Sequence, residues 1–396
     1  MKNNRTFLEK LLDGAEVEWK TLDEISSIYG GLTGKGKADF ENGNALYVPY
    51  KNIFNNIEVD FNNLETVNVS DDEKQYTIKY GDVLFTGSSE TAEEAGMSSA
   101  VTTKTEQKIY LNSFSFGLRF NDDVELLPEF SKFLFRTLSI RKEIVKSASG
   151  VTRFNISKAR FKKIKIPIPP LPVQTEIVKI LDALTALTSE LTSELILRQK
   201  QYEYYRETLL SSDNLEQLNT GGVKKRLSDV AIIGTGSRNT NEAIENGIYP
   251  FFVRSQEPKK INEYEFDETA IITAGDGVGV GKVFHYISGK YALHQRAYRI
   301  VVTDKNLLPK FLFHYIRNNF AHYLKMTSVN SSVTSLRKPM FEKYPVFIPP
   351  LEEQQRIVSI LDKFETLTNS ITKGLPLAIE QSQKRYEYYR ELLLSF

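Results

Sequence analysis

Along residues 177–209, apolar and amphipathic side chains recur in alternating steps of four and three residues. This heptad spacing is typical of a helix that packs one face against a partner helix. At about 1.5 Å per residue the helix would be roughly 50 Å long, more than a helix docked on its own domain needs. The pattern therefore predicts a coiled coil. Its seam comprises Ile177, Leu181, Leu184, Thr188, Leu191, Leu195, Arg198, Tyr202, Tyr205 and Leu209.

The sequence of this helix is written twice. IPPLPVQTEIVKILDALTALT (168–188) matches IPPLEEQQRIVSILDKFETLT (348–368), and QKQYEYYRETLL (199–210) matches QKRYEYYRELLL (383–394). Between these two words the second copy has four more residues than the first, where the first copy reads TSELTSEL (188–195). Gly374 and Pro376 lie in that part of the second copy and are expected to break or kink its helix.

Short β-rich runs bounded by Gly, Asn and Asp precede each helical copy. They include ALYVPYKNI, YTIKYGDVLF and SFSFGLRF in the first half, and IYPFFVR, TAIITAGD and YALHQRAYRIVV in the second. Helical segments follow, over 128–146 and 309–326. These runs predict strands, so the fold class is α+β. We expect domains over 1–166 and 213–346, and long helices over 167–212 and 347–396 that pair antiparallel.

Composition limits the kinds of site. The chain has 396 residues and a formal net charge of +1. It contains no cysteine, which excludes disulfides, thiolate zinc sites and a cysteine nucleophile. No apolar run reaches the roughly 18 residues of a membrane span, and the N-terminus does not resemble a signal peptide. We therefore expect a cytoplasmic protein without membrane contact. The four histidines lack metal-ligand spacing, so no metal site is expected.

No catalytic constellation is found. GDGVGVGKV (275–283) has glycine at every second position but fits neither the phosphate-loop nor the dinucleotide pattern. One interpretation is a strand and turn approached closely by another backbone. The other is that bare amides near Gly277 and Gly279 approach a phosphate.

Basic residues cluster at corresponding places in the two halves. SKARFKKIK (157–165) follows Arg153, and Arg337 and Lys338 occupy the equivalent place in the second half. A solvated face would explain each cluster alone, but recurrence favours contact with nucleic-acid phosphates. The candidate DNA-binding residues are Lys35, Lys37, Ser88, Arg153, Lys158, Arg160, Gly277, Gly279, Lys282, Arg296, Arg337 and Lys338.

The YEYYRE words at 202–207 and 386–391 are identical although the domains have diverged. Tyr202 and Tyr205, with Tyr386 and Tyr389 in the second copy, fit the seam of the coiled coil. The remaining aromatic and basic positions are expected to point away from the seam, toward partner subunits. These candidates are Tyr204, Arg206, Tyr388 and Arg390.

With these two paired repeats and the order domain, helix, domain, helix, the chain resembles the specificity subunit of type I DNA restriction–modification enzymes. The resemblance covers essentially the whole chain. It implies two pseudo-symmetric α+β target recognition domains, each reading one half of a bipartite double-stranded DNA site, separated by an antiparallel coiled coil. It also implies two adenine methyltransferase subunits and motor–endonuclease subunits as partners. S-adenosylmethionine, ATP and Mg are expected on those partners, and no cofactor or catalytic residue in this chain.

Two other functions remain open on the residues alone. The chain could be a scaffold whose coiled coil is the function and whose domains bind proteins instead of DNA. It could also be a DNA enzyme acting by itself, which would bind S-adenosylmethionine without partners.

Overall fold

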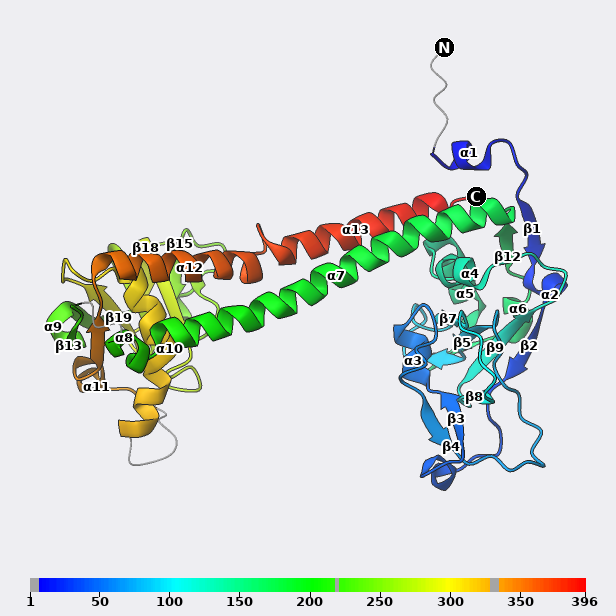
Figure 1. Ribbon diagram of the computed structural model, residues 1–396, viewed down its shortest axis with the longest axis horizontal. Helices are drawn as coiled ribbons and strands as arrows, with labels where there is room; N and C mark the ends of the chain where they lie inside the picture. Colours follow the sequence, from blue (N-terminus) through cyan, green and yellow to red (C-terminus); the bar gives the residue numbers. More distant parts are fainter. Residues whose placement is uncertain (1–6, 218–220, 328–334) are drawn as a thin grey trace, which may run out of the picture. The chain divides into compact units, whose positions relative to one another are not determined.

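The computed structural model describes residues 7–217, 221–327 and 335–396 (Figure 1). The chain forms two compact units. Unit 1 comprises Met1–Glu190 and Glu380–Phe396, and unit 2 comprises Leu191–Ile379. Helix α7 (Leu171–Leu210) begins in unit 1 and ends in unit 2, while α13 (Leu375–Leu393) begins in unit 2 and ends in unit 1. The long helices are therefore divided between the units and do not form a unit of their own.

Unit 1 is α+β. Its larger sheet has the strand order β2-β9-β5-β7, and β4-β3-β8, β10-β11-β6 and β1-β12 are smaller. The strands are β1 Glu18–Thr21, β2 Ser26–Gly30, β3 Ala45–Val48, β4 Glu65–Val67, β5 Val83–Thr86, β6 Ser88–Ser89, β7 Ser98–Ala100, β8 Ile109–Leu111, β9 Ser115–Phe120, β10 Ala148–Ser149, β11 Phe154–Ile156 and β12 Lys165–Ile168. The helices are α1 Phe7–Leu12, α2 Leu22–Ile25, η1 Lys37–Phe40, α3 Tyr50–Asn55, α4 Pro128–Leu134, α5 Leu138–Ser147 and α6 Lys158–Phe161.

Unit 2 is also α+β, with one sheet of order β14-β19-β17-β18-β15-β16 and the pair β13-β20. The strands are β13 Val223–Arg226, β14 Ala231–Thr235, β15 Tyr249–Phe252, β16 Lys259–Ile261, β17 Phe266–Ala274, β18 Phe284–Leu293, β19 Ala297–Val302 and β20 Pro345–Ile348. The helices are α8 Ser212–Gln217, α9 Leu227–Val230, η2 Thr240–Glu242, α10 Pro309–Thr327, α11 Lys338–Glu342 and α12 Leu351–Asn369.

The two units repeat the same strand pairings. β1 pairs antiparallel with β12 as β13 does with β20, and β2 pairs with β9 as β14 does with β19. β3 runs parallel to β8, and β15 runs parallel to the end of β18. In unit 1 α4 packs on β5 and β7, and in unit 2 α10 packs on β17 and β18 (Figure 1). The expected pseudo-symmetric pair of α+β domains is confirmed.

Matched phenylalanines anchor the short helices α6 and α11 in the two cores. Phe161 is fully buried and lies edge-on to Phe85, with ring centroids 4.9 Å apart. Phe341, its counterpart in the repeat, is fully buried and stacks on Phe320, with centroids 5.0 Å apart. Each aromatic pair adds about 0.5–1.5 kcal/mol beyond the area that it buries. The basic residues around these helices are therefore carried on elements fixed by the core.

The coiled coil is antiparallel, as predicted. Thr188 Oγ1 lies 2.8 Å from Ser382 Oγ, and further along α7 the Tyr205 ring stacks on Phe364 with centroids 5.5 Å apart. As residue numbers rise along α7, the numbers of the residues that it contacts fall, so the paired helices run antiparallel. The predicted seam residues are buried or half-buried, except for Tyr205, which is more exposed. The 3.5-residue period thus predicted the packed face correctly.

The second helical copy is interrupted between α12 and α13. Residues 370–374 are not helical, and Gly374 has φ +81°. A Cβ on Gly374 would lie 2.6 Å from the carbonyl oxygens of Thr366 and Leu367, so both the conformation and the space favour glycine. The expected break is confirmed. The additional four residues of the second copy fall at this break and do not lengthen a continuous helix.

A glutamine shared by both repeat words ties each long helix to its own unit. Gln174 is fully buried; its Oε1 accepts a hydrogen bond from the Leu127 N–H (2.9 Å), and its Nε2 donates to the carbonyls of Glu125 (2.8 Å) and Pro169 (2.7 Å). Gln354 makes the same three bonds, with Leu308, Asn306 and Pro349. Since all partners are backbone groups, this clasp is independent of the side chains that differ between the units.

Replacing Gln354 by alanine is expected to lower the free energy of unfolding of unit 2 by about 2–4 kcal/mol, because one N–H and two carbonyls lose their buried partner. Gln355→Ala is the matched control, since Gln355 is the exposed neighbour on the same helix. Its effect should stay within about 0.5 kcal/mol. Urea unfolding of the full chain measures both variants, and equal midpoints for the two would contradict the clasp.

Among the described residues, none of the helices combines the length and the apolar composition that crossing a bilayer requires.

Candidate nucleic-acid interface

In unit 1, three segments meet at a glycine that follows β5. The Gly87 N–H donates to the carbonyl of Phe114 (2.8 Å), and the Gly87 carbonyl accepts from the Ile156 N–H (2.9 Å). A Cβ at this position would lie 2.7 Å from the Phe114 oxygen. This meeting point, which we call the Gly87 junction, therefore requires glycine, and it fixes the backbone of the neighbouring Ser88.

The same junction exists in unit 2, after β17. The Gly275 N–H donates to the carbonyl of Arg296 (2.9 Å), and the Gly275 carbonyl accepts from the Leu336 N–H (2.7 Å). A Cβ there would lie 2.6 Å from the Arg296 oxygen. In this Gly275 junction, Asp276 takes the place of Ser88. The backbone frame is thus duplicated, while the side chains mounted on it differ.

A cavity of about 550 Å³ opens beside the Gly87 junction. Ser88, Phe114 and Arg153 line it, with Tyr50 and Phe54 from α3. The Arg153 Nε donates to Ser88 Oγ (3.1 Å), and the guanidinium carbon lies 5.5 Å from the centroid of the Phe114 ring, whose side chain is 59 % exposed. The structure thus brings together two sequence-predicted residues, Ser88 and Arg153, with an aromatic residue that the sequence did not single out.

At the Gly275 junction, one carboxylate holds two arginines. Arg254 Nη1 donates to Asp276 Oδ1 (2.8 Å), and Arg296 Nη1 donates to Asp276 Oδ2 (3.2 Å). Partial burial acts to raise the pKa of Asp276, but the two guanidiniums outweigh it and hold that pKa below its ordinary value. Arg296 was predicted from the sequence, whereas Arg254 and Asp276 were not.

The glycine run after Asp276 fits the interpretation in which another backbone segment comes close to it. A Cβ on Gly279 would lie 2.8 Å from the carbonyl oxygen of Arg254, so a second backbone does come close. Gly277 has φ +80° and is exposed, whereas Gly279 is buried. An approach of the Gly277 amide to a phosphate stays a prediction.

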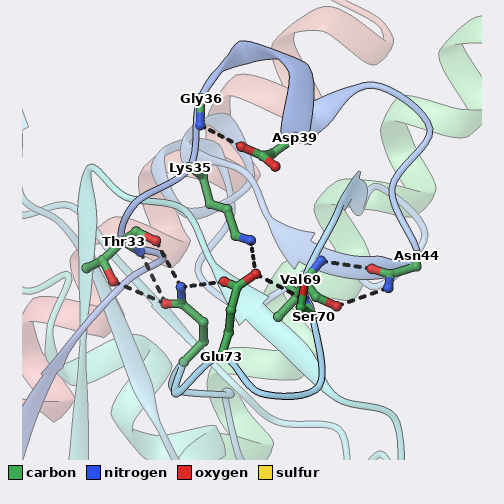
Figure 2. A network of polar contacts seen from close by, with 9 residues as sticks. Thr33, Lys35, Gly36, Asp39, Asn44, Val69, Ser70 and Glu73 are labelled. Atoms are coloured by element: carbon green, nitrogen blue, oxygen red, sulfur yellow. Dashed lines mark hydrogen bonds and ion pairs between the residues drawn. The ribbon is translucent and has the colours of Figure 1, made fainter.

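Lys35 does not present its charge to a ligand (Figure 2). Its side chain is only 6 % exposed, and Nζ pairs with Glu73 Oε1 at 2.5 Å. Glu73 also accepts from the Ser70 N–H and from Gln75, and these bonds, that from Lys35 foremost, lower the pKa of Glu73 to about 2. We correct the sequence expectation accordingly: Lys35 secures its own loop because an acidic partner, distant in sequence, neutralises it.

The remaining predicted basic residues lie on the surface. Lys37, Lys158, Lys282 and Arg337 are exposed. Arg160 and Lys338 are exposed as well. Three of the six also contact their own unit: Lys158 Nζ lies 5.8 Å from the centroid of the Phe116 ring, Arg160 donates to the carbonyl of Lys146 (3.4 Å), and Lys338 lies 3.9 Å from Glu342. Within the described residues, none of these six lines the cavity at the Gly87 junction.

The YEYYRE words present matching tyrosines. Tyr204 is 64 % exposed and Tyr388 is 63 % exposed, as predicted for side chains directed away from the seam. Leu138, Tyr388 and Leu392 border one surface hollow in unit 1.

The two arginines of these words also contact their own unit, and Arg390 lines the same surface hollow as Tyr388; that they face partner subunits stays a prediction. Arg206 lies over the ring of Tyr202 and donates to Asn318 Oδ1 (3.2 Å). Arg390 lies over the ring of Tyr386 and pairs with Glu391 at 2.8 Å. Each arginine folds back over the tyrosine one helical turn earlier, because the ring face attracts the guanidinium and a polar partner lies beside it.

One histidine lies among carboxylates in unit 2. His314 Nε2 is 2.8 Å from Asp362 Oδ1, and Glu365 is close enough for the three to hold a metal ion. Both carboxylates, however, already pair with cations, Asp362 with Lys310 (3.6 Å) and Glu365 with Arg317 (2.8 Å). The geometry therefore fits an ion-pair network between α10 and α12.

A family model described as the type I restriction modification DNA specificity domain matches the chain twice, over residues 15–198 and 220–381. The chain belongs to this family. The two matched stretches each contain one junction and the first word of the repeat, 168–188 in one and 348–368 in the other, so the duplication seen in the structure is that of the specificity domain.

Full-length relatives agree with this assignment. The specificity chain is 39 % identical to a Haemophilus influenzae protein assigned to the type I restriction enzyme specificity subunits, and the alignment covers 100 % of both chains. It is 32 % identical to the EcoR124I/EcoR124II specificity subunit of Escherichia coli, over 99 % of this chain and 97 % of that one.

Solved structures of specificity subunits share the fold. The HsdS subunit of Thermoanaerobacter tengcongensis superposes with a TM-score of 0.54 at 16 % identity, covering 96 % of this specificity chain and 95 % of the other. The subunit from Mycoplasma genitalium gives a TM-score of 0.52 at 15 % identity, covering 96 % and 97 %. At such identities the likeness extends to the fold and not to individual side chains.

Proposed function

We propose that this chain is the DNA-recognition subunit of a type I restriction–modification complex, in which each unit reads one half of a bipartite site. The observation that carries the proposal is the pair of junctions. The same backbone hydrogen bonds recur at Gly87 and Gly275. The side chains beside them differ: Ser88 with Arg153 in one unit, Asp276 with Arg254 and Arg296 in the other. The same backbone arrangement with different polar side chains suits two domains that read different DNA sequences.

Exposed basic residues would supply sequence-independent affinity. Lys37, Lys158 and Arg160 in unit 1, and Lys282, Arg337 and Lys338 in unit 2, are exposed and suited to phosphate contacts. With a net charge of only +1, attraction to DNA must come from such local patches. The coiled coil would set the number of base pairs between the half-sites.

The chain would act without catalysing a reaction itself. In this proposal two methyltransferase subunits dock on it and methylate adenine with S-adenosylmethionine, and motor–endonuclease subunits bring ATP and Mg. The complex would work in the cytoplasm, where bacterial DNA lies. The matched tyrosines Tyr204 and Tyr388 are the best candidates for methyltransferase contacts, because large exposed aromatic side chains at equivalent places suit a repeated interface.

Replacing Tyr204 and Tyr388 together by serine should weaken co-purification of the methyltransferase at least tenfold, because exposed aromatic anchors carry a large share of interface energy. Tyr76→Ser is the matched control, since Tyr76 is a similarly exposed tyrosine outside the repeats. Thermal unfolding should be unchanged in both variants. Full recovery of the methyltransferase with the double variant would remove these tyrosines from the interface.

Binding to DNA separates this proposal from a protein scaffold. The complex should bind duplex DNA carrying its site with nanomolar to micromolar affinity that falls steeply as salt rises. A scaffold would bind equally weakly to all duplexes. The isolated chain should not bind S-adenosylmethionine; binding by the chain alone would support an enzyme acting by itself.

A further inference from the structure

At both junctions, the residue that follows the glycine orients arginines. In unit 1 the hydroxyl of Ser88 holds Arg153 through its Nε, and the ring of Phe114 lies under the guanidinium. Within the described residues, the terminal nitrogens Nη1 and Nη2 of Arg153 have no protein partner. The guanidinium is thus held at its Nε edge, and Arg153 is among the residues that line the cavity.

In unit 2 the same backbone position carries Asp276, and the arginines come from other segments. Arg254 follows β15, and Arg296 precedes β19. Each uses Nη1 on a different oxygen of the carboxylate, 2.8 and 3.2 Å away. In the part of the chain that the structure describes, the Nε and Nη2 of both arginines make no hydrogen bond, and both side chains are partly exposed.

We infer that Arg153 in unit 1, and Arg254 and Arg296 in unit 2, read guanines in the two half-sites, with Ser88 and Asp276 as the positioning residues. The inference rests on the proposed function. Two parallel N–H donors match the O6 and N7 acceptors that guanine presents in the major groove, a pattern that the other bases lack.

The surroundings of these arginines favour base edges over phosphates. A phosphate contact needs a positive charge but little orientation, and the exposed lysines can supply it. Here the guanidiniums are held in place before any ligand binds, which lowers the conformational entropy lost on binding. The Asp276 carboxylate would also repel a phosphate at this place, whereas it can orient donors toward a neutral base.

Methylation-site mapping tests the inference, in a host that expresses the full chain with its methyltransferase and motor subunits. Arg153→Lys keeps the positive charge but loses the two parallel N–H donors of the guanidinium. It should relax one guanine position in one half-site, lowering discrimination against other bases by about 5- to 150-fold. Asp276→Asn, and Arg254→Lys or Arg296→Lys, should relax guanine positions only in the other half-site. Arg385→Lys is the matched control, because Arg385 is an exposed arginine on α13 outside both junctions, and it should leave the motif unchanged.

A positioning role for Ser88 has its own signature. Ser88→Ala should relax the same guanine position as Arg153→Lys, and Ser88→Thr, which keeps the hydroxyl, should restore it. Each variant should unfold at the wild-type temperature. An unchanged motif in Arg153→Lys, or relaxation at a base other than guanine, overturns the inference. A wild-type chain that directs no bipartite methylation would instead refute the proposed function itself.

Discussion

A third TSEL inserted after Leu195 is expected to keep both half-sites and to widen the spacer between them by one or two base pairs. Four residues lengthen a helix by about 6 Å and rotate the following turn by only about 40°. A coiled coil can absorb that rotation as a stutter. Along B-DNA, at roughly 3.4 Å per base pair, 6 Å corresponds to one to two base pairs. Deleting one TSEL should shorten the spacer or abolish activity.

The interruption between α12 and α13 makes the insertion tolerable. Thr188 contacts Ser382 and Tyr205 contacts Phe364, so paired residue numbers add up to 569 or 570, and residues 370–374 lie opposite residues 195–200, directly after the second TSEL. A non-helical segment of this length can extend to roughly 17 Å. It can therefore follow a longer α7 without losing packed helical turns.

Methylome sequencing measures the spacer in the wild type, which has two TSEL units, and in the insertion variant, which has three. Thr192→Ala combined with Ser193→Ala is the matched control, because it changes the second tetrad without changing its length. Its spacer should equal that of the wild type. The same spacer in the insertion and the wild type would mean that the repeat is a neutral duplication.

Exchange of one recognition domain is expected to replace one half-site completely and to leave the other intact. The sequence suggested a first domain over 1–166, but β12 (Lys165–Ile168) crosses that boundary and pairs with β1. Exchanging 1–170 from a related subunit keeps that strand pair together. The Gln174 clasp bonds only to backbone groups and should accept the new domain.

The C-terminal helix constrains the choice of donor. In unit 1 the Tyr386 ring packs near Phe133 and the Phe396 ring near Phe130, with centroids 6.3 and 6.4 Å apart. A donor with aromatic residues at both positions should fold. The reciprocal exchange of 221–350 should change the opposite half-site, and methylome motifs report both outcomes. Simultaneous change of both half-sites in either hybrid would contradict the division into two readers.

The elements with regular periods were predictable from sequence. The heptad residues from Ile177 to Leu209 set the packed face, and Gly374 with Pro376 marked the break, because both signals are local. The β-rich runs also indicated strands: TAIITAGD (269–276) overlaps β17, and YALHQRAYRIVV (291–302) contains β19. The repeat then fixed the order of domains and helices.

The reading residues were only partly predictable, because they depend on contacts between distant segments. Arg254, Asp276 and Arg296 lie on separate segments, and only the folded sheet brings them together. Lys35 was misassigned for the same reason, since nothing near it in sequence reveals that Glu73 neutralises it. A charge pattern identifies basic residues, but their availability depends on tertiary partners.

The most direct test of the account is methylome mapping of a host that lacks adenine methylation of its own and expresses the wild-type chain with its methyltransferase. The account predicts adenine methylation at one bipartite motif, two short specific half-sites separated by a spacer of fixed length and unspecified sequence. Methylation at a single continuous motif, or none despite a stable complex, would contradict it.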